Sequence, residues 1–230
     1  MADDVIKHVA AIGAGRMGRG IAHVFAYAGY RVTLADVKPR RAAEHETLLT
    51  AARAEIEGNL KTLAEFGAFD GALIPAMLAR IHFTADLSEL GDADLIFEGV
   101  TETMEAKEAA FAALKEVVGA AAIIASTTST LPVDKLAAFV DRPERFLNAH
   151  WLNPAYLIPL VEVSPGAATR DDVVDTVRRV LEGIGKVPVV CAPTPGYIIP
   201  RIQAVAMNEA ARMVEEGVAS AADIDKAIRT

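Results

Sequence analysis

The sequence reads Gly13-Ala14-Gly15-Arg16-Met17-Gly18 between an apolar run from Val5 to Ile12 and an alanine-rich helical pattern from Met17 to Ala28. In a G-x-G-x-x-G turn of this kind, the first glycine permits a tight turn and the second lets the backbone approach a pyrophosphate. The third lets the helix pack against the strand, and the helix N-terminus supplies N–H groups and positive potential for an anion. This stretch therefore predicts a strand, a phosphate-binding turn and a helix.

An acidic residue follows the next predicted strand. That strand runs from Arg31 to Ala35, and Asp36 follows it, 23 residues after Gly13. A carboxylate here can accept hydrogen bonds from the adenine-ribose hydroxyls and repels a 2′-phosphate, so the predicted cofactor is NAD and not NADP. Three basic residues nearby would weaken that preference: Lys38, Arg40 and Arg41. A glycine turn that serves packing alone is the alternative, but loop, helix and acid coincide here.

Strand and helix patterns alternate along most of the chain, which predicts a mostly parallel sheet covered by helices on both faces. The fold class is therefore α/β, with a Rossmann-type doubly wound sheet. At 191–196 two prolines and a glycine break the alternation, and only helical patterns follow, at 198–216 and from Ala221. We predict an NAD-binding domain at residues 1–191 and the start of an all-helical domain at residues 192–230. The further predicted strands are 81–84, 94–100, 122–126, 145–150, 160–163 and 187–190.

Composition excludes several classes of protein. Lys and Arg total 23 against 31 Asp and Glu, a formal charge of −8, so the chain lacks the basic excess of a nucleic-acid binder. The single Cys191 excludes an intramolecular disulfide and a thiolate metal cluster, and no metal site is predicted. The acidic start, Met1 to Asp4, is unlike a signal peptide, and no apolar stretch approaches the ~20 residues of a membrane span. We expect a cytoplasmic protein with neither nucleic-acid nor membrane partners.

Polar residues follow three later strands, where ligands bind in open α/β sheets. The segments are Ser126 to Thr130 and His150 to Pro154, and Glu162 lies within the apolar run 160–163. A carboxylate flanked by Leu and Val needs a partner, since an unpaired buried charge is costly. His150 is the natural candidate, and such a pairing would fix its tautomer and suit it for acid–base catalysis. The alternatives are a structural histidine and a Ser/Thr turn that caps a helix.

With these motifs in order, the sequence resembles the 3-hydroxyacyl-CoA dehydrogenase family over nearly the whole chain. The resemblance rests on the glycine turn and on later motifs at family-like separations. These motifs are Gly13–Ala22, Glu98–Glu102 with Lys107, Ser126–Pro132, His150–Pro154 with Leu160–Val163, Gly185–Val189 and Pro195–Ile198. Several ordered motifs are far more specific than one glycine turn.

The resemblance implies a reaction and a set of site residues. The reaction is the reversible, NAD-dependent oxidation of the 3-hydroxyl of a 3-hydroxyacyl-CoA or related 3-hydroxy acid, as in fatty acid metabolism. The family's catalytic histidine falls on His150, its carboxylate partner on Glu162, and the serine that contacts substrate and nicotinamide on Ser129. A helical second domain would close over the substrate and form a homodimer in the full-length enzyme. Expected cofactor contacts are Gly13, Gly15, Arg16, Met17, Gly18, Asp36, Glu102, Lys107, Ser129 and Asn153.

Three positions depart from the family pattern. Pro200 stands where members that act on acyl-CoA carry an Asn before an Arg, and Lys61 is the one basic residue near the expected CoA phosphates. Trp151 with Leu152 replaces the usual Phe-Phe, and Trp151 is expected either to reshape the pocket wall or to serve packing. These changes point to a free 3-hydroxy acid, such as a carnitine-like or sugar acid, as an alternative substrate. A non-catalytic dinucleotide-binding protein is a second alternative, but it would need neither His150 nor Glu162.

The length of 230 residues leaves room for only a small second domain. Related enzymes have several more helices there, and the sequence ends at Thr230 inside a helical pattern. We therefore expect a shortened form of a longer enzyme, with an intact NAD site and most of the substrate lid and dimer interface missing.

Overall fold

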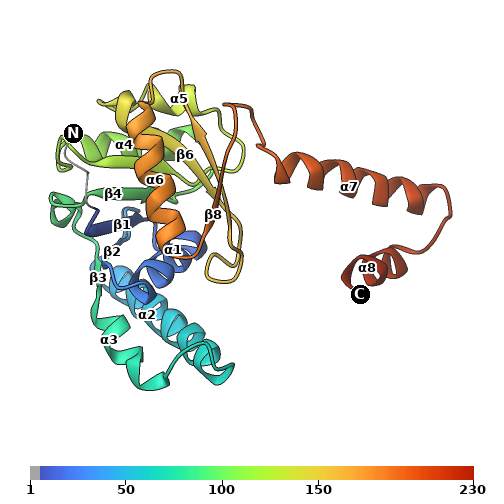
Figure 1. Ribbon diagram of the computed structural model, residues 1–230, viewed down its shortest axis with the longest axis horizontal. Helices are drawn as coiled ribbons and strands as arrows, with labels where there is room; N and C mark the ends of the chain where they lie inside the picture. The colour runs from blue at the N-terminus through green and yellow to red at the C-terminus, as the bar shows by residue number, and fades with distance from the viewer. Residues whose placement is uncertain (1–5) are drawn as a thin grey trace.

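Within residues 6–230, the part of the chain that the computed structural model describes, eight strands form one sheet (Figure 1). Their order across the sheet is β3-β2-β1-β4-β5-β6-β7-β8. The strands are β1 (His8–Ile12), β2 (Arg31–Ala35), β3 (Ile81–Thr84), β4 (Leu95–Glu98), β5 (Ile123–Ser126), β6 (Phe146–Trp151), β7 (Leu160–Pro165) and β8 (Val187–Val190). The order of the first six strands is that of dinucleotide-binding folds, which confirms the predicted Rossmann-type sheet.

All neighbouring strands pair in parallel except β6 and β7, which are antiparallel. The sheet is therefore mostly parallel, as the alternation predicts. The chain between Trp151 and Leu160 holds no helix and is too short for the dozen or more residues of a parallel crossover. The strand predicted from Val5 begins outside the described residues, and the observed strand begins at His8.

Eight α-helices accompany the strands in the described part of the chain (Figure 1). They are α1 (Arg16–Tyr27), α2 (Ala42–Glu65), α3 (Ile74–Ala79), α4 (Met104–Lys115), α5 (Val133–Ala137), α6 (Asp171–Gly183), α7 (Ile199–Glu215) and α8 (Ala221–Arg229). Figure 1 shows α7 and α8 standing away from the sheet at the end of a long connection from β8. None of the helices within residues 6–230 is both long and apolar enough to cross a membrane.

The alternating side chains of the central strands supply two apolar cores, one on each face of the sheet. Val9 and Ala11 of β1 contribute to a core that includes residues of α1, α2, α3 and α6. Ala10 and Ile12 of the same strand contribute to a second core with residues of α4 and α5. A strand buried on both faces in this way explains why β1 reads as one continuous apolar run.

The two C-terminal helices begin and end where the sequence predicts. Pro200 lies in the first turn of α7, where a missing N–H costs little. Gly217 follows that helix with a positive φ of 74°, and the Ser220 hydroxyl accepts a hydrogen bond from the Asp223 amide to cap α8. Neither helix has a buried residue in the described structure, so their apolar side chains remain exposed.

Candidate active site

The glycine turn between β1 and α1 is shaped by two close backbone approaches. Gly13 has a φ of +92°, and a Cβ built on it would lie 2.6 Å from the Gly99 carbonyl oxygen. A Cβ on Gly18 would lie 2.1 Å from the Gly13 oxygen. Gly15 differs, because a Cβ there would meet nothing within 4 Å. Packing explains Gly13 and Gly18, whereas open space beside Gly15 fits a ligand phosphate that must come close to the backbone.

A cavity of about 300 Å³ extends from this turn to Asp36. The buried Asp36 carboxylate accepts a hydrogen bond from Arg40 Nε at 2.8 Å, and His45 Nδ1 lies 2.9 Å from the same oxygen, Oδ2. The other oxygen, Oδ1, has only a long contact of 3.5 Å with the Lys38 amide. One carboxylate oxygen is therefore available for ribose hydroxyls, and the cavity fits the adenosine half of NAD. Of the basic neighbours, Arg40 pairs with Asp36, while Arg41 bonds Glu44.

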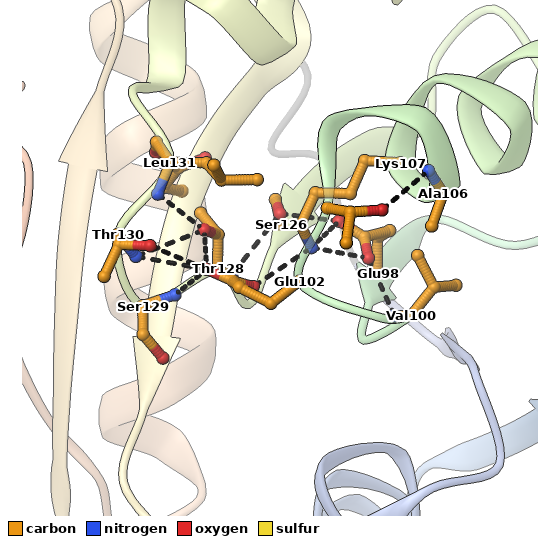
Figure 2. Close-up of polar contacts among 12 residues, drawn as sticks. Glu98, Val100, Glu102, Ala106, Lys107, Ser126, Thr128, Ser129, Thr130 and Leu131 are labelled. Carbon is orange, nitrogen blue, oxygen red and sulfur yellow. Dashed lines mark hydrogen bonds and ion pairs between the residues drawn. The ribbon is translucent and has the colours of Figure 1, made fainter.

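A buried ion pair joins Glu98, at the end of β4, to Lys107 of α4 (Figure 2). Lys107 Nζ donates to both oxygens of Glu98, at 2.9 and 2.8 Å, and both side chains have no exposed surface. Ser126 Oγ and the Val100 amide also donate to Glu98. In this structure the Lys107 ammonium is fully enclosed by protein. The cofactor contact expected of Lys107 stays a prediction. Glu98 itself is absent from the predicted site, although it is a carboxylate in an apolar strand like Glu162.

Glu102 ties down the loop that carries Ser129 (Figure 2). Its Oε1 accepts hydrogen bonds from the Thr128 hydroxyl at 2.5 Å and from the amides of Ser129 and Thr130 at 2.8 and 3.2 Å. Burial alone would raise the pKa of this carboxyl, but the bond from Thr128 and the charge of Lys107 outweigh it and lower the pKa. Glu102 therefore stays ionised and holds the Ser129 backbone in place. The cofactor contact expected of Glu102 stays a prediction.

His150 and Glu162 face each other across the antiparallel pair β6 and β7. His150 Nδ1 lies 2.8 Å from Glu162 Oε2, and both side chains are buried. Because a carboxylate only accepts, Nδ1 is the donor and the neutral ring presents Nε2 as an acceptor. The contact predicted from the buried carboxylate is present, and its catalytic role stays a prediction.

Sequence reasoning missed Tyr197, which lies against this pair. The Tyr197 and His150 rings are stacked, with centroids 5.1 Å apart and planes at 12°. The amides of Ile198 and Ile199 donate to the second oxygen of Glu162, at 2.8 and 2.9 Å. The aromatic residue after Pro195-Gly196 belongs to a motif of the resemblance, but nothing in the sequence places it beside His150.

The other predicted positions lie around the same edge of the sheet. Ser129 is half-buried in the loop after β5, the strand next to β6. Asn153 is exposed just beyond β6 and precedes a cis Pro154. Arg16 is exposed and Met17 half-buried at the start of α1, beside the glycine turn.

Trp151 packs in the apolar core on one face of the sheet. It is 3% exposed, and its ring contacts those of Phe25 and Phe97, with centroids 6.3 and 5.5 Å away. These contacts support the packing role expected of Trp151, and the effect expected on the pocket wall stays a prediction.

A Rossmann fold, a glycine turn open at Gly15 and a histidine–carboxylate pair at the same sheet edge define an NAD-dependent oxidoreductase. Family models agree: the 3-hydroxyacyl-CoA dehydrogenase NAD-binding domain matches residues 8–194, and the C-terminal domain of the same family matches residues 196–230. The chain belongs to the 3-hydroxyacyl-CoA dehydrogenase family. The predictions of this family, of NAD as cofactor and of an oxidoreductase are thereby confirmed.

Individual relatives match this chain over most of their own length. The chain is 38% identical over 214 residues to a probable 3-hydroxybutyryl-CoA dehydrogenase of Deinococcus radiodurans, covering 93% of this chain and 74% of that protein. It superposes on the crystal structure of M. tuberculosis FadB2 with a TM-score of 0.89 and 34% identity, covering 97% and 77%. It is also 32% identical to a 5-formyl-3-hydroxy-2-methylpyridine 4-carboxylate 5-dehydrogenase of Mesorhizobium japonicum, covering 97% and 70%.

Proposed function

We propose that this chain catalyses the reversible oxidation of the 3-hydroxyl of a 3-hydroxyacyl-CoA, with His150 as general acid and base. The observation that carries the proposal is the buried 2.8 Å contact between His150 Nδ1 and Glu162. It fixes one tautomer, leaves Nε2 to exchange a proton with the substrate, and places a negative charge where an imidazolium would form. Relatives named as 3-hydroxybutyryl-CoA and 3-hydroxyadipyl-CoA dehydrogenases support the substrate class.

Different residues of the chain bind the cofactor and transfer the proton in the proposed reaction. The Gly13–Gly18 turn and the start of α1 hold the pyrophosphate, and Asp36 Oδ1 accepts from ribose hydroxyls. Bound NAD supplies the hydride acceptor for C3 of the substrate. His150 Nε2 takes the proton of the 3-hydroxyl, and Glu162 stabilises the resulting imidazolium. In the reverse direction His150 returns the proton, while the Ser129 hydroxyl donates a hydrogen bond to the same substrate oxygen.

A free 3-hydroxy acid remains the second candidate substrate, because the expected CoA contacts are weak here. Lys61 pairs with Glu57 at 2.6 Å on the surface of α2, and Pro200 provides neither a side-chain amide nor an N–H. The Mesorhizobium relative is named for a pyridine carboxylate, which shows that the family is not confined to thioesters. The greater number of CoA-named relatives favours the thioester.

A substrate panel tests the proposal. NADH formation would be measured with 3-hydroxybutyryl-CoA and with free 3-hydroxybutyrate, carnitine and a 3-hydroxy sugar acid, each with NAD and with NADP. We expect turnover with the thioester and NAD. Turnover of a free acid without turnover of the thioester would replace the first candidate with the second. NADH binding without turnover of any member would favour a non-catalytic dinucleotide-binding protein.

Three expectations about the whole protein belong to the same proposal. The domain boundary lies near residue 191, so that residues 1–191 form the NAD-binding domain. The full-length enzyme is a homodimer, which size-exclusion chromatography with light scattering would test. The protein is cytoplasmic, which fractionation of the source cells would test.

A further inference from the structure

Tyr197 has an unusual backbone conformation next to the proposed catalytic pair. Its φ of 44° is the only positive value at a non-glycine residue within residues 6–230. A side chain disfavours this left-handed region, so such a residue persists only where its surroundings hold it in place. The geometry of the turn alone does not require tyrosine here. The contacts of this side chain must therefore explain the position.

The ring and the hydroxyl of Tyr197 have different partners. The ring lies parallel to the His150 imidazole, at 12° and 5.1 Å between centroids, and only 5% of the residue is exposed. The hydroxyl donates to the Thr128 carbonyl oxygen at 2.9 Å and accepts from Asn148 Nδ2 at 3.0 Å. Burial raises the pKa of this phenol, so it remains a neutral donor. One side chain thus joins His150 to the loop that carries Ser129.

The backbone after Tyr197 completes the arrangement. The left-handed turn aims the amides of Ile198 and Ile199 at Glu162 Oε1, while Oε2 of the same carboxylate receives His150. The two amides fix the carboxylate. The carboxylate fixes one ring atom of His150, but a single hydrogen bond leaves the plane of the imidazole free to tilt.

We propose that Tyr197 is the positioning residue of the active site: its ring fixes the plane of His150, and its hydroxyl holds that ring in register with the Ser129 loop. This inference rests on the proposed function. A general base must lie within hydrogen-bond reach of its proton and point along the bond, and small misplacements lower the rate steeply. Tyr197 contributes through His150 and is not among the residues that line the cavity for the adenosine half of NAD, at the β1–β4 side of the sheet.

Two substitutions separate the ring from the hydroxyl. Tyr197→Phe keeps the stacked ring and removes both hydroxyl contacts, whereas Tyr197→Leu removes the ring as well. We expect Tyr197→Leu to lower kcat roughly 10–100-fold. Tyr197→Phe should lower kcat by only about 3–5-fold. The NADH dissociation constant should change less than kcat does in either variant, because Tyr197 does not line the cavity for the adenosine half of NAD. Both variants keep a side chain at the left-handed position, so they are matched in backbone strain.

A double-variant comparison separates positioning from general loosening of the fold. Combined with His150→Gln, Tyr197→Leu should lower the residual rate less than about 2-fold, since residues that act as a unit are not additive. The proposal would be overturned if Tyr197→Leu lowered kcat by the same factor in the wild type and in His150→Gln. It would also be overturned if Tyr197→Phe and Tyr197→Leu lowered kcat equally.

An NMR measurement decides the matter without turnover. The Nδ1 proton of His150 should give a slowly exchanging ¹⁵N-coupled signal in the wild type, identified by its loss in His150→Gln. The signal should persist in Tyr197→Phe and exchange rapidly in Tyr197→Leu. An unchanged signal in Tyr197→Leu would overturn the positioning role. If the wild type turned over no 3-hydroxy substrate, the proposed function would fail while this signal still tested the position of His150.

Discussion

Glu98 and Glu162 are buried glutamates at the functional edge of the sheet, and they differ in their partners. Glu98, at the end of β4, is enclosed by Lys107, Ser126 and the Val100 amide, with every contact inside the protein. Glu162, in β7, has one oxygen on two backbone amides and the other on His150. Lysine keeps its charge under ordinary conditions, whereas histidine can change its charge near neutral pH. The first pair suits a structural role, and the second pair suits proton transfer.

Breaking the Glu98–Lys107 pair should have the largest effect on stability. Lys107→Met leaves a buried carboxylate uncompensated, so the free energy of unfolding should fall by about 3–5 kcal/mol. Lys107→Met with Glu98→Gln removes both charges and should lose less than the single variant. Urea unfolding followed by circular dichroism measures both.

Lys115→Met provides the matched control from the same helix. Lys115 pairs with Asp141 on the surface, with 38% of its side chain exposed, so its loss should cost less than about 1 kcal/mol. A Lys107→Met variant no less stable than this control would show that the buried pair contributes nothing.

The buried His23 has no hydrogen-bond partner among the described residues 6–230 and should make stability depend on pH. Burial, and secondarily the charge of Lys186, lowers its pKa from 6.5 to about 4. Between these values the unfolded chain binds a proton that the folded chain does not, so stability falls as the pH falls. The contribution is at most about 3 kcal/mol, fully present above pH ~6.5 and lost toward pH ~4.

Substituting His23 by Phe keeps the aromatic stack on Tyr156 and should remove this slope. His82→Gln serves as the control, because 57% of the His82 side chain is exposed, and it should retain the slope of the wild type. Parallel unfolding curves against pH for His23→Phe and the wild type would show that His23 is not the group responsible.

Glu162→Gln should have a smaller effect on free energy than Lys107→Met and the clearest effect on function. The single glutamine oxygen can accept from His150 Nδ1 or from the amides of Ile198 and Ile199, but not from both, and the imidazolium loses its compensating charge. A charge-assisted hydrogen bond contributes about 1.5–3 kcal/mol, so kcat should fall roughly 10–100-fold while NADH still binds. Steady-state kinetics with parallel NADH titration measure this. A normal kcat would remove Glu162 from the mechanism and erase the contrast with Glu98.

Much of the fold follows from local sequence patterns. Three local features predict the first strands and the turn, and all of them lie close together in the sequence. They are the apolar run before Gly13, the glycine spacing and Asp36 after the second strand. The antiparallel pairing of β7 escaped prediction because strand and helix alternation alone does not state the direction of a strand. The short segment from Trp151 to Leu160 carries that information, since a parallel crossover cannot fit in it.

The candidate site was predictable where a buried charge required a partner. Glu162 in an apolar strand pointed to His150, and the same reasoning applied to Glu98 would have pointed to Lys107. Tyr197 could not be predicted, because its place depends on how the start of α7 approaches β6 and β7 across a left-handed turn. Trp151 was ambiguous for a similar reason: the neighbouring strands decide which of the two apolar cores each side chain of β6 joins.

We propose that His150 exchanges the proton of the substrate hydroxyl. The direct measurement is kcat for the oxidation of 3-hydroxybutyryl-CoA by His150→Gln, with NADH affinity determined on the same protein and His82→Gln as control. General acid–base catalysis typically supplies ~10²–10⁴-fold, so we predict a loss of at least about 10²-fold in kcat with NADH binding retained and a normal rate in the control. Near-normal turnover by His150→Gln would contradict the account.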